Sequence, residues 1–313
     1  MPLESGSKKA VFAALLGNLA IAVFKLFAAL ISRSSSMLAE SYHSFSDTMN
    51  QVLLLYGLKR SRRKPDDYHP FGYGKEQFFW SFVVAILLFG IAGTLSVREG
   101  LHKFSHSETI QNIWLTYLAI AVGVFFESIA FRMAVKSLKK EKKTEGYKNL
   151  LTAVRNSKDP TMMTVFIEDL LALTGLFIAA LGVTLVHFTG FLLFDAAASI
   201  LIGILLMGFA LFLAYETRNL LVGESVTRRR RALILKAVQS FEGVEEILSL
   251  RTMHLGSEEV LVALEINFND SLTVEKLEKL NRKLENKILE IIPKARIYIE
   301  ASENIIDGKP GCR

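Results

Sequence analysis

Cysteine is almost absent from this chain of 313 residues: its single occurrence, Cys312, lies in the terminal segment GKPGCR. An intramolecular disulfide is therefore excluded, and no thiolate can bind a metal within the long apolar segments. The sequence also lacks the H-E-x-x-H motif, which places two histidines and a glutamate on one helix around a hydrolytic zinc ion. That absence disfavours an intramembrane metallo-hydrolase, and we do not expect an enzyme.

Hydrophobic residues make up 51% of the chain, too much for an ordinary soluble protein. Apolar runs fill the sequence up to about Tyr215, and charged residues dominate after Glu224. We expect a six-span α-helical transmembrane domain at 1–222, a cytoplasmic α+β domain at 223–303 and a disordered tail at 304–313. The net charge of +6 would suggest nucleic acid for a soluble chain, but the basic residues cluster beside the spans, so we expect no nucleic acid.

Hydropathy predicts six helices that can cross a lipid bilayer, since about 20 helical residues span its hydrocarbon core. Their approximate ranges are 10–32, 37–58, 77–97, 113–135, 161–187 and 191–215. Basic residues crowd the segments after the second, fourth and sixth spans and are sparse in the others. Positively charged loops stay in the cytoplasm, so both termini are predicted to be cytoplasmic. We expect a multi-pass protein of a prokaryotic cell (inner) membrane, with its first span uncleaved.

The second span carries polar residues where a membrane helix is usually apolar. His43, Asp47 and Asn50 are spaced i, i+4 and i+7, so they share one face of the helix. A carboxylate near the middle of a bilayer is costly unless it faces a partner, an ion or water. An imidazole and a carboxylate one turn apart supply half of a tetrahedral metal site. The structural alternative is a histidine that is hydrogen-bonded to a neighbouring helix.

The fifth span contains two adjacent acids, Glu168 and Asp169, inside an apolar run. Asp169 lies eight residues after Thr161 in a helix that enters from the cytoplasm, and Asp47 lies ten residues into a helix that enters from outside. At about 1.5 Å per residue both acids reach the middle of the bilayer, which predicts a shared ion site. Glu168 points about 100° away from Asp169 around the helix axis, and either acid can instead bind a serine or threonine elsewhere.

Other polar residues have weaker signals. The loop after the second span holds Asp66 and His69 among proline and glycine residues, which suits a weak second metal site or a solvated turn equally well. Lys25 in the first span either snorkels to the membrane surface or pairs with an acid of another helix. Structural roles are expected for four polar residues of the spans, namely Asn18, Lys25, Glu127 and Arg132.

The segment after the last span predicts a small α+β domain. Its order is helix, strand, strand, helix and strand, at 228–241, 246–255, 260–268, 273–292 and 296–301. Alternate residues of the second strand are apolar, and leucine and isoleucine residues form one stripe along the second helix. Such a domain is too small to bury a large core alone, which favours packing against a second copy of the chain.

With these segments in view, the sequence resembles the cation diffusion facilitators, a family of six-span divalent-metal exporters, over nearly its whole length. The motifs that carry the resemblance are AESYHSFSD in the second span, HPFGYGKEQ before the third, SKDPTMMTVFIEDLLALTG in the fifth, and the α-β-β-α-β tail. The resemblance implies a homodimer that exchanges cytoplasmic Zn²⁺ for protons, with a metallochaperone-like cytoplasmic domain and no cofactor besides the transported metal. Alternatives are an exporter of Mn²⁺, Co²⁺ or Fe²⁺, and a metal-responsive scaffold that transports nothing.

The resemblance also implies metal ligands, two from the second span and two from the fifth. In the second span they fall on His43 and Asp47. In the fifth span Gly175 fixes the register and places a ligand at Asp169, while Val165 stands where the family usually has histidine. This departure resembles a branch of the family with Glu-Asp in the fifth span.

The fourth ligand is left open between Glu168, Asn50 and water. An oxygen-rich site of this kind would shift the preference towards harder ions such as Mn²⁺. Two weaker sites follow from the resemblance as well. The loop site keeps Asp66 and His69 but has a tyrosine at a histidine position, and the tail keeps Glu265 and Glu300 but has a leucine at a third ligand position.

Overall fold

The computed structural model describes residues 5–105, 109–145, 149 and 160–303. The chain divides into two compact units, one of Met1–Arg60 and Glu76–Arg218 and the other of Ser61–Lys75 and Asn219–Arg313. The loop after the second long helix thus belongs to the second unit, although it interrupts the first in sequence. The tail that was predicted to be disordered, 304–313, lies outside the described residues.

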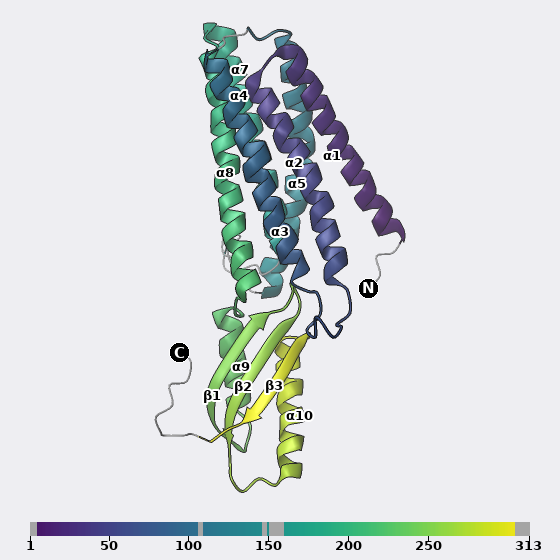
Figure 1. The fold of residues 1–313 in the computed structure, drawn as a ribbon, viewed down its shortest axis with the longest axis vertical. Helices are drawn as coiled ribbons and strands as arrows, with labels where there is room; N and C mark the ends of the chain where they lie inside the picture. Colours follow the sequence, from purple (N-terminus) through teal and green to yellow (C-terminus); the bar gives the residue numbers. More distant parts are fainter. Residues whose placement is uncertain (1–4, 106–108, 146–148, 150–159, 304–313) are drawn as a thin grey trace. The chain divides into compact units, whose positions relative to one another are not determined.

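The first unit is a bundle of long helices that run side by side (Figure 1). They are α1 (Ser5–Ser32), α2 (Ser35–Ser61), α3 (Glu76–Leu87), η1 (Leu88–Gly93), α4 (Thr94–Ser105), α5 (Ile113–Glu145), α7 (Pro160–Thr189) and α8 (Leu193–Val222). Five stretches of the described helices are long and apolar enough to cross a membrane: Leu15–Ser32, Glu76–Ser105, Ile113–Lys139, Val165–Thr189 and Leu193–Val222. The predicted helical membrane region is confirmed. Among the six predicted spans, α2 is long enough to cross a membrane but is not one of these apolar stretches, because it carries many polar residues.

The third predicted span differs from a single regular helix ending at residue 97. It continues to Ser105 and contains the π-helical segment η1 between α3 and α4. The Thr94 hydroxyl donates a hydrogen bond of 3.0 Å to the carbonyl of Phe89, five residues earlier, across the widened turn. Hydropathy could not reveal this segment, because a π turn has the same apolar composition as the α-helix around it.

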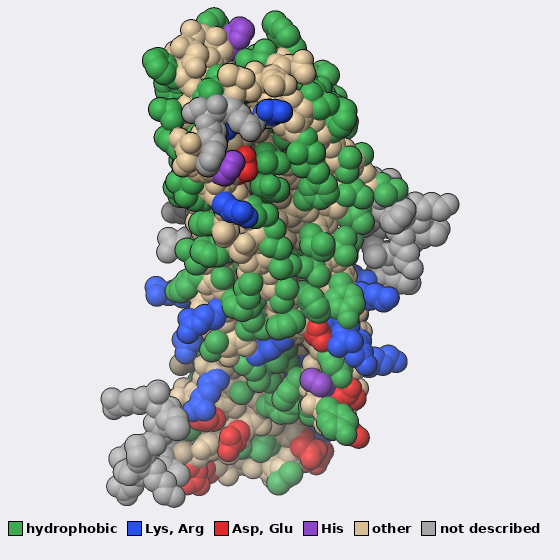
Figure 2. Space-filling model, turned by 45° about the horizontal axis from the view of Figure 1, so that its top comes forward, with side chains coloured by type: hydrophobic (Ala, Val, Ile, Leu, Met, Phe, Trp, Pro, Cys, Tyr) green, Lys and Arg blue, Asp and Glu red, His purple; other side chains and the backbone are tan. Residues whose placement is uncertain are grey.

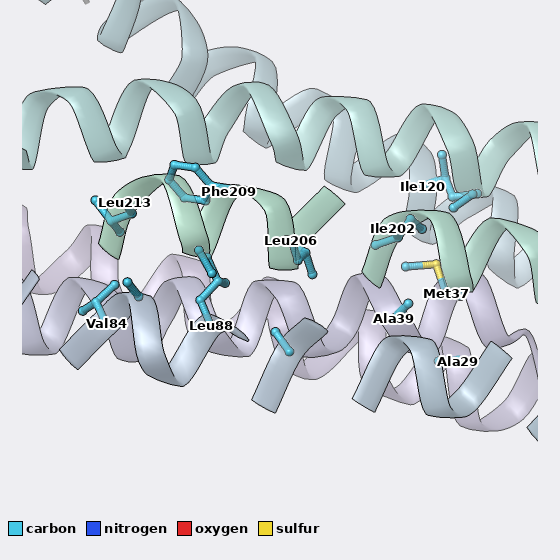
Figure 3. Close-up of a cluster of buried hydrophobic side chains, with 14 of the residues drawn as sticks. Ala29, Met37, Ala39, Val84, Leu88, Ile120, Ile202, Leu206, Phe209 and Leu213 are labelled. Carbon is cyan, nitrogen blue, oxygen red and sulfur yellow. The ribbon is translucent and has the colours of Figure 1, made fainter. Parts of the chain in front are cut away.

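The interior of the bundle is a continuous apolar cluster to which most of its helices contribute. Figure 3 shows Leu206, Phe209 and Leu213 of α8 beside Val84 and Leu88 of α3 and η1. Large apolar side chains also cover the outside of the bundle, as the visible face in Figure 2 illustrates. Examples of these exposed side chains are Phe27, Phe125, Phe177 and Leu211. A helix that is apolar on all sides is typical of a membrane environment.

The second unit contains a three-stranded sheet and two helices. Its elements are α9 (Arg228–Gln239), β1 (Val244–His254), β2 (Val260–Phe268), α10 (Val274–Ile291) and β3 (Ala295–Ala301). The strand order is β1-β2-β3, with β1 antiparallel and β3 parallel to β2. The predicted α-β-β-α-β order is confirmed, and the bounds of β2 are those predicted.

One face of the sheet packs against α9 and α10. Val260, Val262, Leu264 and Ile266, at alternate positions of β2, are buried in a core with Leu280, Leu284 and Ile288 of α10. Burying a side chain of this size contributes about 1.5–3 kcal/mol each. The α10 helix begins after Thr273, whose hydroxyl accepts a hydrogen bond from the Lys276 amide. Strand alternation and the helical stripe therefore specify this core, as the sequence predicted.

The loop Ser61–Lys75 packs on this second unit. The Arg296 guanidinium donates a hydrogen bond of 3.2 Å to the carbonyl of Pro70, and the rings of Phe71 and Tyr298 lie edge to face at 6.4 Å. Lys75 Nζ donates to the carbonyl of Leu221 at 3.1 Å. Because of these contacts, the loop belongs to the same compact unit as the C-terminal part of the chain.

Candidate functional site

The N-terminal end of α2 is fixed by Asp195, a fully buried residue in the first turn of α8. Its carboxylate accepts hydrogen bonds from the Ser35 amide at 2.7 Å, the Ser36 amide at 3.2 Å and the Ser34 hydroxyl at 2.8 Å. Lys103 of α4 donates to the same carboxylate at 2.9 Å. An acid at a helix N-terminus satisfies amides that have no partner within the helix. This anchor was not predicted, although the run of serine residues before the second span is typical of a helix N-terminus.

His43 and Asp47, one turn apart on α2, form the centre of the candidate site. The imidazole Nδ1 lies 3.4 Å from Asp47 Oδ1, and the side chains are 1% and 17% exposed. Neither ring nitrogen of His43 has a hydrogen-bond partner among the described residues, and neither has Asp47 Oδ1. Buried polar atoms are rarely left unsatisfied, so each of these needs an explanation.

Asn50, one turn further along α2, connects this face to α7. Its amide nitrogen donates a hydrogen bond of 2.8 Å to Oε1 of Glu168, which is buried. The Asn50 side-chain oxygen is buried without a hydrogen-bond partner in the described part of the chain. The structure therefore brings together Glu168 and Asn50, the two residues that the sequence left open as a fourth ligand.

Asp169 follows Glu168 on α7 and is only partly buried. Its Oδ2 atom is buried and has no hydrogen-bond partner among the described residues. Within the same described residues, no hydrogen bond or ion pair joins Asp169 to His43 or Asp47, and no three His, Cys, Asp or Glu side chains converge as a metal cluster. The candidate site thus comprises two pairs, His43 with Asp47 and Asn50 with Glu168, and we include Asp169 in it for its unpaired carboxylate oxygen.

Val165, at the position where the resemblance expects histidine, is exposed on the surface of α7. Gly175, which set the register of Asp169, lies against the carboxylate of Glu40 on α2. A side chain at residue 175 would overlap that carboxylate, so glycine permits α2 and α7 to approach at this level.

The loop pair Asp66 and His69 lies in the second unit and is exposed. His69 Nδ1 is 3.4 Å from Asp66 Oδ1, which also accepts a hydrogen bond of 2.8 Å from the His69 amide. The Tyr73 hydroxyl donates to the other carboxylate oxygen at 2.6 Å. This hydrogen bond from Tyr73 holds the pKa of Asp66 below its ordinary value, with a smaller contribution from His69. Both oxygens thus stabilise the turn itself, which supports the interpretation as a solvated turn.

Glu265 and Glu300 are direct neighbours across the parallel strands β2 and β3. Arg251 Nη2 lies 3.7 Å from Glu265 Oε1, so a cation already accompanies one of the two acids. Leu248, at the third position, lies where the pairing of β1 with β2 shifts register. Glu265 and Glu300 can still bind an ion, but the positively charged Arg251 already lies next to Glu265.

A bundle of apolar helices with ionisable side chains buried inside it defines a multi-pass membrane protein, and buried residues of this kind mark ion pathways. The family model described as the cation efflux transmembrane domain matches residues 11–222. The model described as the cation efflux protein cytoplasmic domain matches residues 228–302. The chain belongs to the cation diffusion facilitator family, which consists of metal transporters rather than enzymes.

Three relatives illustrate how the chain is placed within this family. It is 31% identical to metal tolerance protein C4 of Arabidopsis thaliana, over 87% of this chain and 59% of the relative. It is 28% identical to the mitochondrial proton-coupled zinc antiporter SLC30A9 of Xenopus laevis, over 96% of this chain and 55% of the relative. It is 26% identical to the magnetosome protein MamM of Paramagnetospirillum magneticum, over 77% of this chain and 71% of the relative. The chain therefore spans somewhat more than half the length of the first two relatives.

Proposed function

We propose that the protein is a proton-coupled exporter of divalent cations and that Zn²⁺ is the transported ion. The relatives named proton-coupled zinc antiporters support both the ion and the coupling. The proposal includes a homodimer, supported by the match to the cytoplasmic domain model. It also includes a membrane domain at 1–222, a cytoplasmic domain at 223–303, and both termini on the cytoplasmic side of a prokaryotic inner membrane.

The observation that carries the proposal is the set of unsatisfied polar atoms inside an apolar bundle. Those at the candidate site belong to His43, Asp47, Asn50 and Asp169, and all are buried without a hydrogen-bond partner among the described residues. Leaving such atoms unpaired costs about 1–3 kcal/mol each, and more when they are charged. A divalent cation that binds them removes this cost. We assign the ion to His43, Asp47 and Asp169, with Glu168 or Asn50 as an additional ligand.

Which of Asn50 and Glu168 binds the ion would depend on the hydrogen bond between them. Asn50 holds Glu168 through its amide nitrogen, and the unpaired amide oxygen is the atom suited to a cation. The Asn50 oxygen can bind a cation while this hydrogen bond is kept, and Glu168 Oε1 becomes a ligand when the hydrogen bond breaks. Either side chain can then complete the coordination, which is why the fourth ligand stays open between them.

Mn²⁺ is the second candidate for the transported ion, with Co²⁺ and Fe²⁺ in the same class. The donor set favours it, because His43 supplies the single imidazole and every other proposed ligand binds through oxygen. Zn²⁺ accepts carboxylates as well as imidazole, so the donor atoms alone allow both ions.

Coupling to protons follows from the same ligands. Imidazole and carboxylate groups must lose their protons before they can bind a metal ion, so protons and metal compete for the site. Metal affinity should therefore fall as pH decreases. An inward proton gradient would then drive metal outward when the site opens alternately to the two sides.

The test is metal uptake by proteoliposomes that contain the full chain, with Zn²⁺, Mn²⁺, Co²⁺ and Fe²⁺ compared with and without a pH gradient. We expect Zn²⁺ uptake that depends on the gradient and is lost when a proton ionophore dissipates it. Zn²⁺ binding to the purified protein should weaken steadily from about pH 8 to about pH 5.5, because protons compete with the metal for its imidazole and carboxylate ligands. Uptake no faster than in protein-free liposomes would refute transport and favour a scaffold, and an affinity that does not change with pH would refute proton exchange at this site.

A further inference from the structure

A second cluster of charged residues lies inside the helical unit, next to the candidate metal site but separate from its ligands. Lys25 of α1 and Glu40 of α2 are both fully buried, and Lys25 Nζ lies 3.3 Å from Glu40 Oε2. Lys25 also donates a hydrogen bond of 2.8 Å to the Ser44 hydroxyl and lies 3.9 Å from Glu127 Oε1 of α5. Of the two possibilities that the sequence allowed for Lys25, the structure selects pairing with acids of other helices.

Two glycines make room for this cluster. A Cβ atom at Gly123 of α5 would lie 3.0 Å from Lys25 Cε, which is tighter than ordinary van der Waals contact. A Cβ atom at Gly175 of α7 would overlap the Glu40 carboxylate. The backbones of α5 and α7 thus pass directly beside the buried charges. Because Gly175 is on the helix of Asp169 and Glu40 is three residues before His43, the cluster adjoins both helices of the metal site.

One basic side chain meets two acidic side chains in this cluster. The described residues include two buried basic side chains, Lys25 and Lys103, and Lys103 is already bound to Asp195. Lys25 is therefore the basic partner of two acids, Glu40 and Glu127, and Asp47 lies about one turn beyond its hydrogen-bond partner Ser44 on α2. Ser44, the hydrogen-bond partner of Lys25, directly follows the proposed ligand His43 on α2, which places the ammonium group next to the candidate site. One oxygen of Glu40 remains buried without a hydrogen-bond partner in the described structure.

We propose that Lys25 is a tethered cation that, together with Glu40, sets how tightly the neighbouring site holds a transported divalent ion; this rests on the proposed function above. A fixed ammonium repels an incoming dication and attracts the carboxylates that the departing dication leaves behind. It therefore weakens binding and speeds release. Lys25 is a positioning residue, because its contacts are with Glu40, Ser44 and Glu127 and not with the proposed ligands.

The two residues of the pair should act in opposite directions, which distinguishes this role from a merely structural ion pair. Lys25→Met removes the positive charge, so we expect Zn²⁺ to bind about fivefold or more tightly and to turn over more slowly. Glu40→Gln leaves Lys25 with fewer acids around it, so Zn²⁺ should bind about threefold or more weakly. The double variant should return the affinity close to that of the wild type.

The experiment measures Zn²⁺ binding by calorimetry, Zn²⁺ uptake in proteoliposomes and thermal unfolding for the full chain and each variant. Lys59→Met, an exposed lysine near the end of α2, is the matched control and should leave affinity unchanged. Variants that lower thermal stability but keep wild-type affinity would overturn the proposal, as would single variants that shift affinity in the same direction. If Lys25→Met does not fold, the comparison of Glu40→Gln with the double variant gives the same test. Wild-type protein that takes up no Zn²⁺ would instead refute the proposed function.

Discussion

Two histidine–aspartate pairs in this protein have the same distance between the imidazole and the carboxylate but different surroundings. His43 with Asp47 and His69 with Asp66 both place Nδ1 and Oδ1 3.4 Å apart. The first pair is 1% and 17% exposed inside the helical unit, and the second is 53% and 42% exposed on the loop of the second unit. The distance between an imidazole and a carboxylate is therefore not enough to identify a metal site.

What differs is the use of the remaining polar atoms. Both oxygens of Asp66 accept hydrogen bonds from its own loop, and water can solvate what remains. Asp47 Oδ1 and both nitrogens of His43 are buried with no hydrogen-bond partner among the described residues. In a low-dielectric interior, such atoms gain far more from a bound cation than atoms that water already solvates.

The same truncation should have very different consequences in the two pairs. We expect Asp47→Ala to reduce Zn²⁺ uptake by about 100-fold or more, since partners that only orient a metal ligand already contribute about 10–100-fold. Asp66→Ala should keep uptake within about twofold of the wild type, because exposed charge pairs contribute little. The measurement is the initial rate of uptake in proteoliposomes with equal amounts of folded protein. Equal losses in the two variants would show that burial does not distinguish the pairs.

The two adjacent acids of α7, Glu168 and Asp169, also differ in whether their oxygens have hydrogen-bond partners. Asp169 has an unpaired buried oxygen, whereas Oε1 of Glu168 already accepts a hydrogen bond from Asn50. Asp169→Asn removes a charged ligand, so we expect at least about a tenfold loss of Zn²⁺ affinity. Glu168→Gln retains an oxygen that can accept the Asn50 hydrogen bond, so its loss should be smaller. Calorimetry measures the loss of Zn²⁺ affinity in both variants. A larger loss in Glu168→Gln than in Asp169→Asn would assign the ligand to Glu168.

The smallest effect concerns the exposed pair. Tyr73→Phe removes the hydrogen bond that chiefly lowers the pKa of Asp66, so this pKa should rise towards its ordinary value of about 3.9. A carboxyl group with a lowered pKa in the folded state stabilises the protein above its unfolded-state pKa. This contribution is lost as pH falls through the folded-state pKa.

The wild type should therefore be slightly more stable than Tyr73→Phe at neutral pH, and the difference should disappear in acid. An NMR titration of the Asp66 carboxyl carbon measures the shift directly. An unchanged pKa would mean that the hydrogen bond in the loop does not persist in solution. Zn²⁺ binding at the buried site is the control and should be the same in both proteins.

The spacing of apolar and polar residues along the sequence was enough to predict the helices, strand β2 and the pairing of His43 with Asp47. Hydropathy located the apolar helices, and strict alternation defined β2 at Val260–Phe268. The spacing of His43 and Asp47 predicted a pair on one face of α2, and the structure has them 3.4 Å apart. These features succeeded because they depend on the geometry of a single helix or strand.

Which residues of different helices meet depends on the packing of the helices in the folded protein. Sequence spacing could not show that Asn50 binds Glu168, that Lys25 reaches Glu40, or that Asp195 holds the start of α2. These contacts depend on the rotation and the lengthwise shift of one helix against the next, which close packing at small residues such as Gly175 fixes. A helical period determines which side chains share a face, whereas the packing of neighbouring helices determines what that face meets.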